Sequence, residues 1–452
     1  MESKATAMRH NRKSSSLFRL WGTVTRIVSG ALEIHGVSDF ACVGDEIEIE
    51  NGGELVTGEI LSVAKSHVVA LLHSSASNVQ IGDVAYINPE KGVVISDRWL
   101  GQIVNYRGEI KGAPNGHHHT QKSHNLFAPA PPAHLRRTLG SRISTGLMVT
   151  DTLLPICRGQ RIGLFAGSGV GKSTLLGNIS RSVKADRIVI ALIGERSREV
   201  IEFARKTLTP EMLSKAVIVA ATSSEPAGAK KRAAYCAMAA AEYFRDQGHD
   251  VLFVFDSLTR FAEAHRETAL IAGEQPALHA YPPSTNRIIA ELTERAGPGI
   301  PGTGDITAIF SVLVAGSNME EPVTDMIRGI LDGHIVLSRE IAERGRYPAI
   351  DVARSVSRSL PSAATEDQNS LLREYRQMLT LYEEVAPMLR ANLYEFGQDP
   401  VTDRAIRLFT AMDLFICERN AYEIEDAFAH LRSLLRAEDT PQQTASASGE
   451  AA

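Results

Sequence analysis

Residues 161–176 read RIGLFAGSGVGKSTLL, an apolar run, a glycine-rich turn and the start of a helix-forming stretch. Strand, loop and helix in this order are the context in which a GxxxxGKS pattern binds nucleotide phosphates. The glycines let successive backbone N–H groups point at phosphate oxygens, and the helix adds its positive end. We therefore predict a phosphate-binding loop composed of Ala166, Gly167, Ser168, Gly169, Val170, Gly171, Lys172, Ser173 and Thr174.

Two side chains of this loop have a defined expected chemistry. Lys172 is expected to reach the β- and γ-phosphates of ATP, and Ser173 is expected to ligate Mg²⁺. Ala166 stands where the pattern has its first glycine, which slightly weakens the match. A glycine-rich turn with a purely structural role is the alternative, but the lysine and serine after the last glycine favour phosphate binding.

Four further apolar runs follow the loop along the chain. They read RIVIALIG (187–194), AVIVAATS (216–223), VLFVFD (251–256) and ITAIFSVLV (306–314), with the Ala-rich helical stretch KRAAYCAMAAAEYFRDQ (231–247) between two of them. Alternating strands and helices predict a mostly parallel sheet with helices on its faces. The expected core is an α/β P-loop domain of the RecA-like kind.

Acids stand at the ends of two of these runs. Asp256 closes the run VLFVFD, and Glu195 follows RIVIALIG with Arg196 beside it. Parallel strands deliver their last residues to the edge of the sheet where the phosphate loop lies. Asp256 is therefore expected to hold Mg²⁺ through a water, and Glu195 to orient and deprotonate the attacking water. The alternatives are an acid that merely ends a strand and a surface charge cluster.

The regions on either side of the core have patterns of their own. Short runs such as DEIEIENGGELVTGEILSV (45–63) predict a small β-barrel, and beyond residue 361 only helical periodicity remains. The expected division is an N-terminal arm (1–20), a β-barrel domain (21–96), a P-loop ATPase core with its linker (97–362), a helical C-terminal domain (363–437) and a disordered tail (438–452).

Composition and charge narrow the class of protein. The 452 residues are 44% hydrophobic and 22% charged with a net charge of −5, which is typical of a soluble globular α/β protein and gives no general signal for nucleic-acid binding. No apolar run reaches the roughly 20 residues that cross a bilayer, and the first residues lack the apolar stretch of a signal peptide. The four cysteines are too far apart for a CxxC metal site or a dense disulfide framework. We expect a cytoplasmic protein.

Five segments carry a resemblance to a known family. They read RGQRIGLFAGSGVGKSTLL (158–176), LIGERSREV (192–200), VLFVFDSLTRFAEA (251–264), AYPPSTNRIIAELTERAGPG (280–299) and RGILDGHIVLSREIAERGRYPAIDVARSVSR (328–358). In this order and spacing they resemble the catalytic ATPases of flagellar and type III secretion export systems, relatives of the α and β subunits of rotary ATP synthases. The resemblance implies a Mg²⁺-dependent ATP hydrolase that energises protein export through the flagellar apparatus, with the virulence-type apparatus as the alternative.

The resemblance also implies roles that spacing alone does not show. Glu195 looks like the catalytic base, Tyr347 like the aromatic residue that packs on adenine, and Arg358 like an arginine finger that acts across a subunit boundary. Arg196 and Arg260 are expected to support the phosphate site. Because Glu195 and Arg358 occur in one polypeptide, a ring of identical chains, expected to be a hexamer, would have a complete site at every interface.

Further partners are implied by the same resemblance. The family's use of its N-terminal segment implies a regulatory, stator-like protein bound there, with a disordered basic tail as the alternative. The anchor candidates in this segment are Met8, Leu17, Phe18 and Leu20 beside Arg9, Arg12, Lys13 and Arg19. Contacts with the export gate, chaperones and export substrates are also implied, with the protein at most peripheral to the inner membrane.

Two stretches depart from the family pattern. His279 and Ala280 precede the motif YPPS (281–284) where family members commonly have Arg-Gly, and Asn286 stands where they commonly have a phenylalanine. The role of this loop in a ring is therefore expected to differ. The linker also carries clustered histidines, for which metal binding is a weak alternative to a solvated loop. They are His117, His118, His119 and His124.

The sequence favours an export ATPase over two other classes of protein. A non-catalytic subunit of a rotary ATPase is expected to have its base replaced, whereas Glu195 is present. A hexameric RNA translocase is expected to carry basic and aromatic residues on its barrel. The barrel region is acidic instead, and we expect no nucleic-acid partner. Its acids are Glu33, Asp39, Asp45, Glu46, Glu48, Glu50, Glu54 and Glu59.

Overall fold

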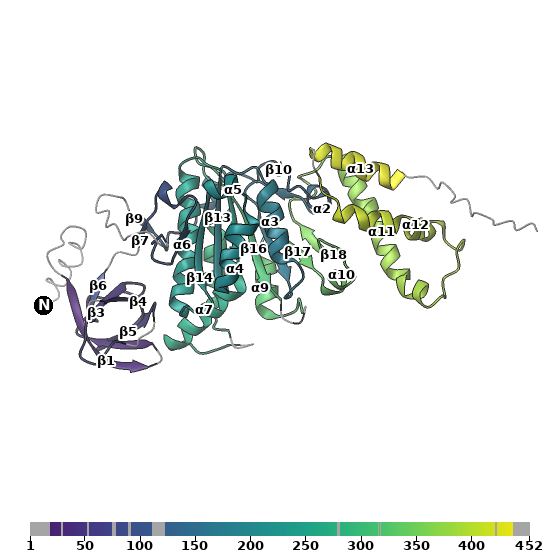
Figure 1. The fold of residues 1–452 in the computed structure, drawn as a ribbon. Coiled ribbons are helices and arrows are strands. Elements are labelled where there is room, and N and C mark those ends of the chain that lie inside the picture. Colours follow the sequence, from purple (N-terminus) through teal and green to yellow (C-terminus); the bar gives the residue numbers. More distant parts are fainter. Residues whose placement is uncertain are drawn as a thin grey trace, which may run out of the picture.

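The computed structural model describes most of the chain and shows three parts in a row, a barrel, a sheet covered by helices and a helical domain (Figure 1). The described residues are 19–28, 30–51, 54–74, 78–88, 92–110, 123–277, 281–314, 316, 318–420 and 423–436. Several expectations fall on residues outside these ranges. They concern the arm from Met8 to Phe18, the linker histidines His117, His118 and His119, the pair His279 and Ala280, and the tail (438–452).

Six antiparallel strands close into the predicted barrel, in the order β1-β2-β5-β4-β3-β6. Ile47 and Ile49 are buried inside it while Glu50 is exposed, as the alternation of side chains along a strand requires. Leu20, expected in the arm, begins the first strand. The strands are β1 (Leu20–Val28), β2 (Ala31–His35), β3 (Glu46–Asn51), β4 (Glu54–Val63), β5 (His67–Leu72) and β6 (Val84–Asn88).

Two acids of the barrel face the core and attach the two domains to each other. Glu46 lies 3.3 Å from the guanidinium of Arg232, and Glu59 lies 3.4 Å from the Nζ of Lys231. All four side chains are largely buried. Part of the acidic character of the barrel therefore serves its contact with the long helix that carries Lys231 and Arg232.

The core is built on one eight-stranded sheet in the order β18-β17-β12-β16-β15-β13-β14-β8. Neighbouring strands are parallel except β18, which runs antiparallel to β17. The predicted parallel sheet is confirmed, with one antiparallel edge strand. The strands are β8 (Ile103–Val104), β12 (Arg161–Ala166), β13 (Arg187–Glu195), β14 (Ala216–Thr222), β15 (Val251–Asp256), β16 (Ile306–Leu313), β17 (Gly333–Leu337) and β18 (Ile350–Ser357).

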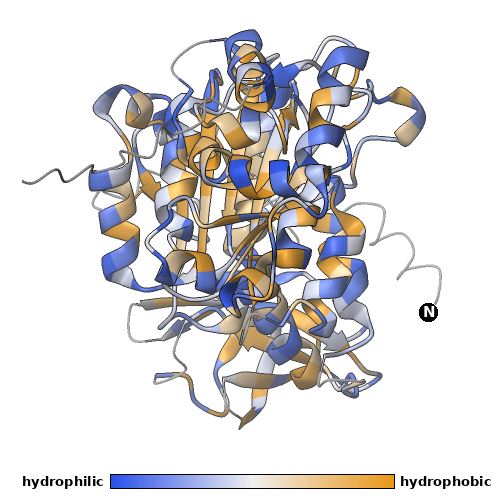
Figure 2. Cartoon of the chain, turned by 90° about the vertical axis from the view of Figure 1, so that its right-hand side faces the viewer, coloured by the Kyte–Doolittle hydropathy of each residue, from blue (hydrophilic) through white to orange (hydrophobic). Residues whose placement is uncertain are grey.

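Helices cover both faces of this sheet, and Figure 2 shows the apolar strands enclosed between them. Successive strand residues alternate between two hydrophobic clusters, so that Leu164 packs into one and Phe165 into the other. The first face carries α3 (Lys172–Ser182), α4 (Ser197–Glu202), the π-helical turn η3 (Phe203–Thr207) and α5 (Pro210–Ser214). The second carries α6 (Ala227–Asp246), α7 (Leu258–Ile271), α8 (Ser284–Glu294) and α9 (Pro322–Ile330).

Several short elements lie between the barrel and the core or between the longer elements of the core. His124 lies on one of them, where its ring packs edge-on against Tyr243 at 5.1 Å between centroids. The elements are β7 (Gly92–Val94) paired with β9 (Ser123–Asn125), η1 (Asp97–Trp99), η2 (Ala133–Leu135), β10 (Arg142–Ile143) paired with β11 (Ile156–Cys157), α2 (Met148–Asp151) and α10 (Arg339–Glu343).

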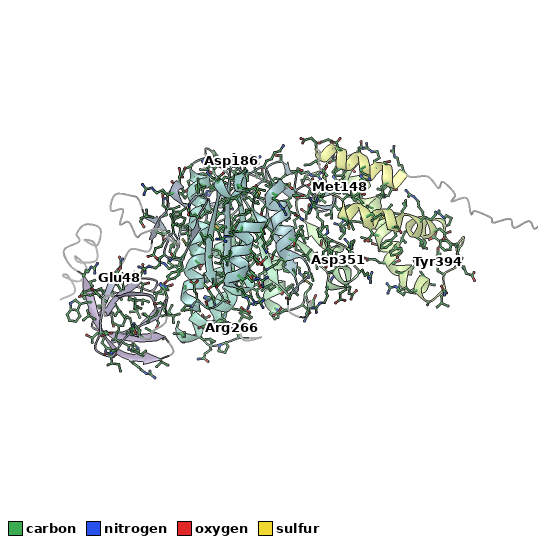
Figure 3. The ribbon with its side chains drawn as sticks, viewed as in Figure 1. Glu48, Met148, Asp186, Arg266, Asp351 and Tyr394 are labelled. Carbon is green, nitrogen blue, oxygen red and sulfur yellow. The ribbon has the colours of Figure 1, made fainter. Side chains whose placement is uncertain are left out.

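Three helices form the predicted C-terminal domain, α11 (Glu366–Arg390), α12 (Pro400–Cys417) and α13 (Ile424–Arg436). Thr365 and Gln368 form a capping box that begins α11. Figure 3 labels Met148 where α2 meets this domain and Tyr394 at its far tip. Neither these helices nor any other helix in the described part of the chain is long and apolar enough to cross a membrane.

Candidate active site

The phosphate-loop sequence forms the predicted strand, loop and helix. β12 ends at Ala166 and α3 begins at Lys172. Gly169 and Gly171 have φ angles of 79° and 91°, in the left-handed region that glycine adopts without strain. Val170 between them is buried and holds the turn against the core, while Gly169 stays exposed at its top. The loop is therefore preformed for a phosphate.

Three predicted side chains meet beside the loop. The Nζ of Lys172 lies 2.5 Å from Oδ1 of Asp256 and 3.7 Å from Oε1 of Glu195. The sheet explains this contact, because β15 ends at Asp256 and the neighbouring parallel strand β13 ends at Glu195. The structure thus brings together the expected phosphate-binding lysine, metal-side acid and water-activating acid.

The surroundings of Glu195 change its acidity. Burial raises the pKa of Glu195 to about 7, and the negative charge of Asp256 and a hydrogen bond with Glu199 act in the same direction, while Lys172 opposes the shift. A carboxyl with a pKa near neutral pH changes its protonation under working conditions. Glu195 is therefore chemically suited to take a proton from a water molecule.

β16 contributes a residue that no sequence motif indicated. Ser311 is fully buried, and its hydroxyl donates a short hydrogen bond to Oδ1 of Asp256. That oxygen accepts from both Ser311 and Lys172, which holds the carboxylate in one orientation. A hydroxyl inside the apolar run ITAIFSVLV was the available signal, because a buried serine requires a hydrogen-bond partner.

Tyr347 lies against the phosphate loop in the segment between α10 and β18. Its Cδ1 and Cε1 are 3.4 and 3.5 Å from the position that a Cβ on Gly171 would occupy. The side chain is 53% exposed, so part of the ring remains uncovered. An aromatic ring in this position can stack on a planar base whose phosphates occupy the loop.

Arg260 and Arg196, both expected to support the phosphate site, differ in their placement near the end of β13. Arg260 on α7 packs against Gly194, where a Cβ would lie 3.0 Å from the Cβ of Arg260, and its guanidinium pairs with Glu263 at 2.8 Å. Arg196 is 82% exposed and its guanidinium lies 3.4 Å from Glu199. Of the two expected supporting residues, Arg260 adjoins Glu195 and Arg196 extends into solvent.

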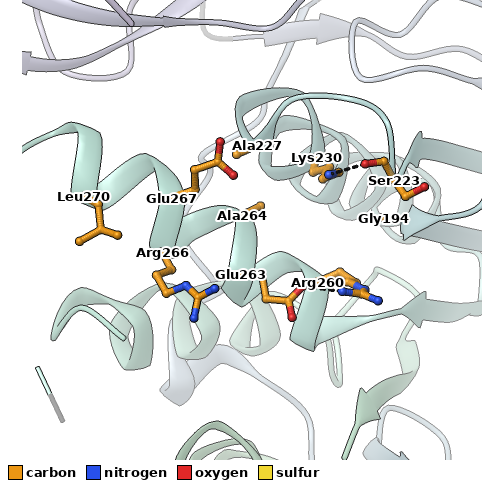
Figure 4. Close-up of a pocket in the computed structure, with 10 residues that line it drawn as sticks. All are labelled: Gly194, Ser223, Ala227, Lys230, Arg260, Glu263, Ala264, Arg266, Glu267 and Leu270. Atoms are coloured by element: carbon orange, nitrogen blue, oxygen red, sulfur yellow. Dashed lines mark hydrogen bonds and ion pairs between the residues drawn. The ribbon is translucent and has the colours of Figure 1, made fainter. Parts of the chain in front are cut away.

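An open pocket of about 550 Å³ adjoins Gly194 and Arg260. Figure 4 shows that α7 contributes most of its charged side chains, with Lys230 and Ser223 on the other side. The Nζ of Lys230 donates to the backbone oxygen of Ser223 at 3.0 Å. The pocket has both signs of charge and belongs to the surface around the Glu195 edge.

Arg358 lies far from this cluster in its own chain. It follows β18, and its backbone N–H donates to the oxygen of Asp332, just before β17 begins. Ser357 pairs with Gly333 on β17, which is level with Ile162 on β12. Ile162 lies four residues before Ala166, where the phosphate loop begins. Measured along the strands, Arg358 is therefore about 13 Å from the loop. Among the described residues, its exposed guanidinium donates only to the backbone oxygens of Gly329 and Arg328, at 3.5 and 3.4 Å.

Comparisons with known proteins extend over nearly the whole chain. Residues 146–357 match the model of the ATP synthase alpha/beta family, nucleotide-binding domain. Residues 364–433 match the model of the T3SS EscN ATPase C-terminal domain. A protein named flagellum-specific ATP synthase, from Caulobacter vibrioides, is 40% identical over 93% of this chain and 96% of its own length.

Two solved structures share the fold. The assembled ATPase EscN from the enteropathogenic E. coli type III secretion system has a TM-score of 0.86 and 36% identity, covering 92% of this chain and 100% of that one. EscN in complex with its central stalk EscO has a TM-score of 0.82 and 35% identity over the same shares.

Proposed function

This chain belongs to the family of flagellum-specific ATP synthases and type III secretion ATPases, and we propose that it hydrolyses Mg²⁺-bound ATP to energise protein export through a flagellar apparatus. The contact of Lys172 with Asp256 and Glu195 carries the proposal. The names of the sequence relatives favour the flagellar apparatus. The likeness to EscN keeps the virulence-type apparatus as the second candidate.

The cluster supports hydrolysis by in-line attack of water on the γ-phosphate. Lys172 pairs with Asp256 here, and ATP in the loop would draw its ammonium toward the β- and γ-phosphates, where it offsets the charge that develops. Glu195, with its pKa near 7, orients the water and accepts its proton. A non-catalytic subunit is expected to lack this acid, whereas Glu195 is present here and lies 3.7 Å from Lys172 of the phosphate loop.

The donor set fits Mg²⁺. The hydroxyl of Ser173, one residue into α3, and the carboxylate of Asp256 are hard oxygen donors, and Mg²⁺ combines one or two such groups with substrate phosphates and waters. Bound there, the ion would neutralise phosphate charge. No group of three or more His, Cys, Asp or Glu side chains in the described ranges could form an all-protein metal site, which suits such a shared ion.

Arg358 supports assembly into a ring. Because it lies at the sheet edge opposite the loop, it can meet Glu195 only between two copies. A contact between two different surfaces repeats head to tail, and it gives a ring when the rotation from copy to copy closes. EscN is solved as an assembled ATPase. We propose a hexamer with one site at each interface, completed by Arg358 of the neighbouring copy.

The remaining partners follow from the family. EscN is solved with a central stalk, EscO, and we propose an equivalent stalk for this chain, together with a stator-like regulator bound at the N-terminal arm. The export gate, chaperones and export substrates complete the set. Contact with the export gate would hold the ring at the cytoplasmic face of the inner membrane, as a peripheral protein.

Two measurements test this function. Purified protein is expected to release phosphate from ATP only with Mg²⁺ present, and Lys172→Ala is expected to abolish the release because the γ-phosphate loses its cation. Expression in a strain that lacks its flagellar export ATPase is expected to restore motility. Secretion restored only in a strain that lacks its virulence-type ATPase would support the second candidate instead.

A further inference from the structure

The segment that carries Tyr347 is held by the C-terminal helices. Arg346, the residue before it, places its Nε 3.1 Å from Oδ1 of Asp413 on α12. The same guanidinium donates to the backbone oxygens of Pro348 at 3.3 Å and Ile350 at 3.0 Å. One arginine therefore ties both flanks of Tyr347 to another domain.

A second residue of α12 lies near the segment that carries Tyr347. Cys417 lies one helical turn beyond Asp413 on α12. Burial raises the pKa of its thiol, while the nearby side chain of Arg346 and backbone N–H of Tyr347 act against that shift. The thiol in turn donates to the backbone oxygen of Asp413 at 3.6 Å. α12 thus contacts Arg346 through Asp413 and stays close to the same segment one turn later, at Cys417.

This attachment matters because the tyrosine ring is only partly covered. Tyr347 is half exposed, and its ring rests on Gly171, which has no side chain to interlock with it. Arg346, in contrast, is only 13% exposed and uses all three nitrogens of its planar fork. The position of the ring therefore depends on the backbone of the segment. The side chain of Arg346 holds that backbone together with backbone hydrogen bonds from Arg346 to Ile341 and from Ser338 to Ala349.

We propose that Arg346 and Asp413 are positioning residues that hold Tyr347 against the phosphate loop, so that the C-terminal helices set the affinity of the site for the base of ATP. The inference rests on the proposed function and on the contact of Tyr347 with adenine that the family resemblance implies. It gives the C-terminal domain a role in binding the base of ATP, whereas the phosphate loop binds the phosphates. A partner that shifts α12 would change nucleotide affinity through this ion pair.

The test compares binding of two ligands, a fluorescent ATP analogue and inorganic tripolyphosphate, which carries the phosphates without a base. Asp413→Ala is expected to weaken binding of the ATP analogue about threefold to tenfold, because a partly buried charge-assisted hydrogen bond is lost. Tripolyphosphate affinity and kcat at saturating ATP are expected to stay unchanged. Asp413→Asn, which preserves the side-chain shape, is used if Asp413→Ala lowers the melting temperature.

A matched control and a double variant make the test specific. Glu374 pairs with Arg404 at 2.7 Å between α11 and α12, remote from Tyr347, so Glu374→Ala is expected to leave both affinities unchanged. In a Tyr347→Ala background, Asp413→Ala is expected to have no further effect, because the ring through which it acts is gone.

Three outcomes would count against the inference. Equal weakening of ATP and tripolyphosphate would place the effect at the phosphate loop. Unchanged ATP affinity in Asp413→Ala, while Tyr347→Ala weakens it, would show that the ion pair does not position the ring. Unchanged affinity in Tyr347→Ala itself would remove the proposed base contact and leave ATP hydrolysis as a separate question.

Discussion

The two halves of the proposed catalytic site are held in opposite ways. Lys172 at the start of α3 is largely buried and contacts both Asp256, at the end of β15, and Glu195, at the end of β13. Arg358 is exposed at the other edge of the sheet, where its guanidinium makes two long hydrogen bonds to backbone oxygens. The groups proposed to act within their own chain are in contact with one another through Lys172, whereas the group proposed to act on a neighbour is left accessible to it.

The largest effect is expected from removing the exposed half. Arg358→Ala is predicted to lower kcat about a thousandfold, because an arginine finger stabilises the charge of the transition state. Steady-state ATP hydrolysis measures this, and nucleotide binding by the isolated chain is expected to persist. Arg198→Ala, an equally exposed arginine paired with Glu202, serves as the control. Full activity in Arg358→Ala would remove the finger assignment.

The buried half is tested by an isosteric change. Glu195→Gln is predicted to lower kcat about a hundredfold or more, because the amide cannot accept the proton of the attacking water. The melting temperature is expected to stay equal or rise, since a desolvated carboxyl beside Asp256 is removed. A fall in both kcat and melting temperature would indicate a structural role for Glu195.

The acidity of the buried half gives a pH dependence. Burial raises the pKa of Glu195 to about 7, and only the deprotonated carboxylate can act as a base. kcat/KM is therefore predicted to rise about tenfold from pH 6 to pH 8 and to level off above it. The residual activity of Glu195→Gln is expected to lack this rise. A flat wild-type profile would assign the proton transfer elsewhere.

Ser311 tests how firmly the buried half is preformed. Ser311→Ala is predicted to weaken Mg²⁺–ATP binding about fivefold, because Asp256 loses the hydroxyl that orients it. Ser311→Thr keeps the hydroxyl and is expected to retain wild-type affinity. Titration of nucleotide at several Mg²⁺ concentrations distinguishes the two variants. Equal affinities in alanine and wild type would make Ser311 a packing residue only.

The smallest effect is expected at Arg196. Its side chain is solvent-exposed and pairs with Glu199, which is itself on the surface, so Arg196→Ala is predicted to change kcat and KM little. Initial-rate measurements over a range of ATP concentrations test this. A large loss of kcat would mean that Arg196 turns toward the phosphates when the site is complete.

Local patterns predicted the buried half well. The phosphate loop is contiguous in sequence, and Asp256 and Glu195 stand at the ends of apolar runs that parallel pairing brings to one edge. The barrel was readable from alternation such as Ile47 and Ile49. In each case the deciding interaction is either local in the chain or imposed by the regular geometry of the sheet.

Long-range side-chain contacts could not be read in this way. β18 did not stand out as a strand, because an edge strand keeps polar side chains such as Arg354 in solvent and lacks an apolar run. Ser311 has only its hydroxyl inside an apolar run as a signal, and the pair Arg346 and Asp413 has none. Each of these contacts joins elements distant in sequence, so the partner is not visible locally. Their partners are set by how the elements pack.

One mixing experiment tests the central claim that each site is divided between two copies. Glu195→Gln and Arg358→Ala chains are combined in equal amounts, and ATP hydrolysis is measured against protein concentration. If neighbouring copies share the site, about a quarter of the interfaces in randomly mixed rings pair an intact Glu195 with an intact Arg358, so the mixture regains about a quarter of wild-type activity. If the mixture stays as inactive as its two components, Glu195 and Arg358 do not act together across an interface.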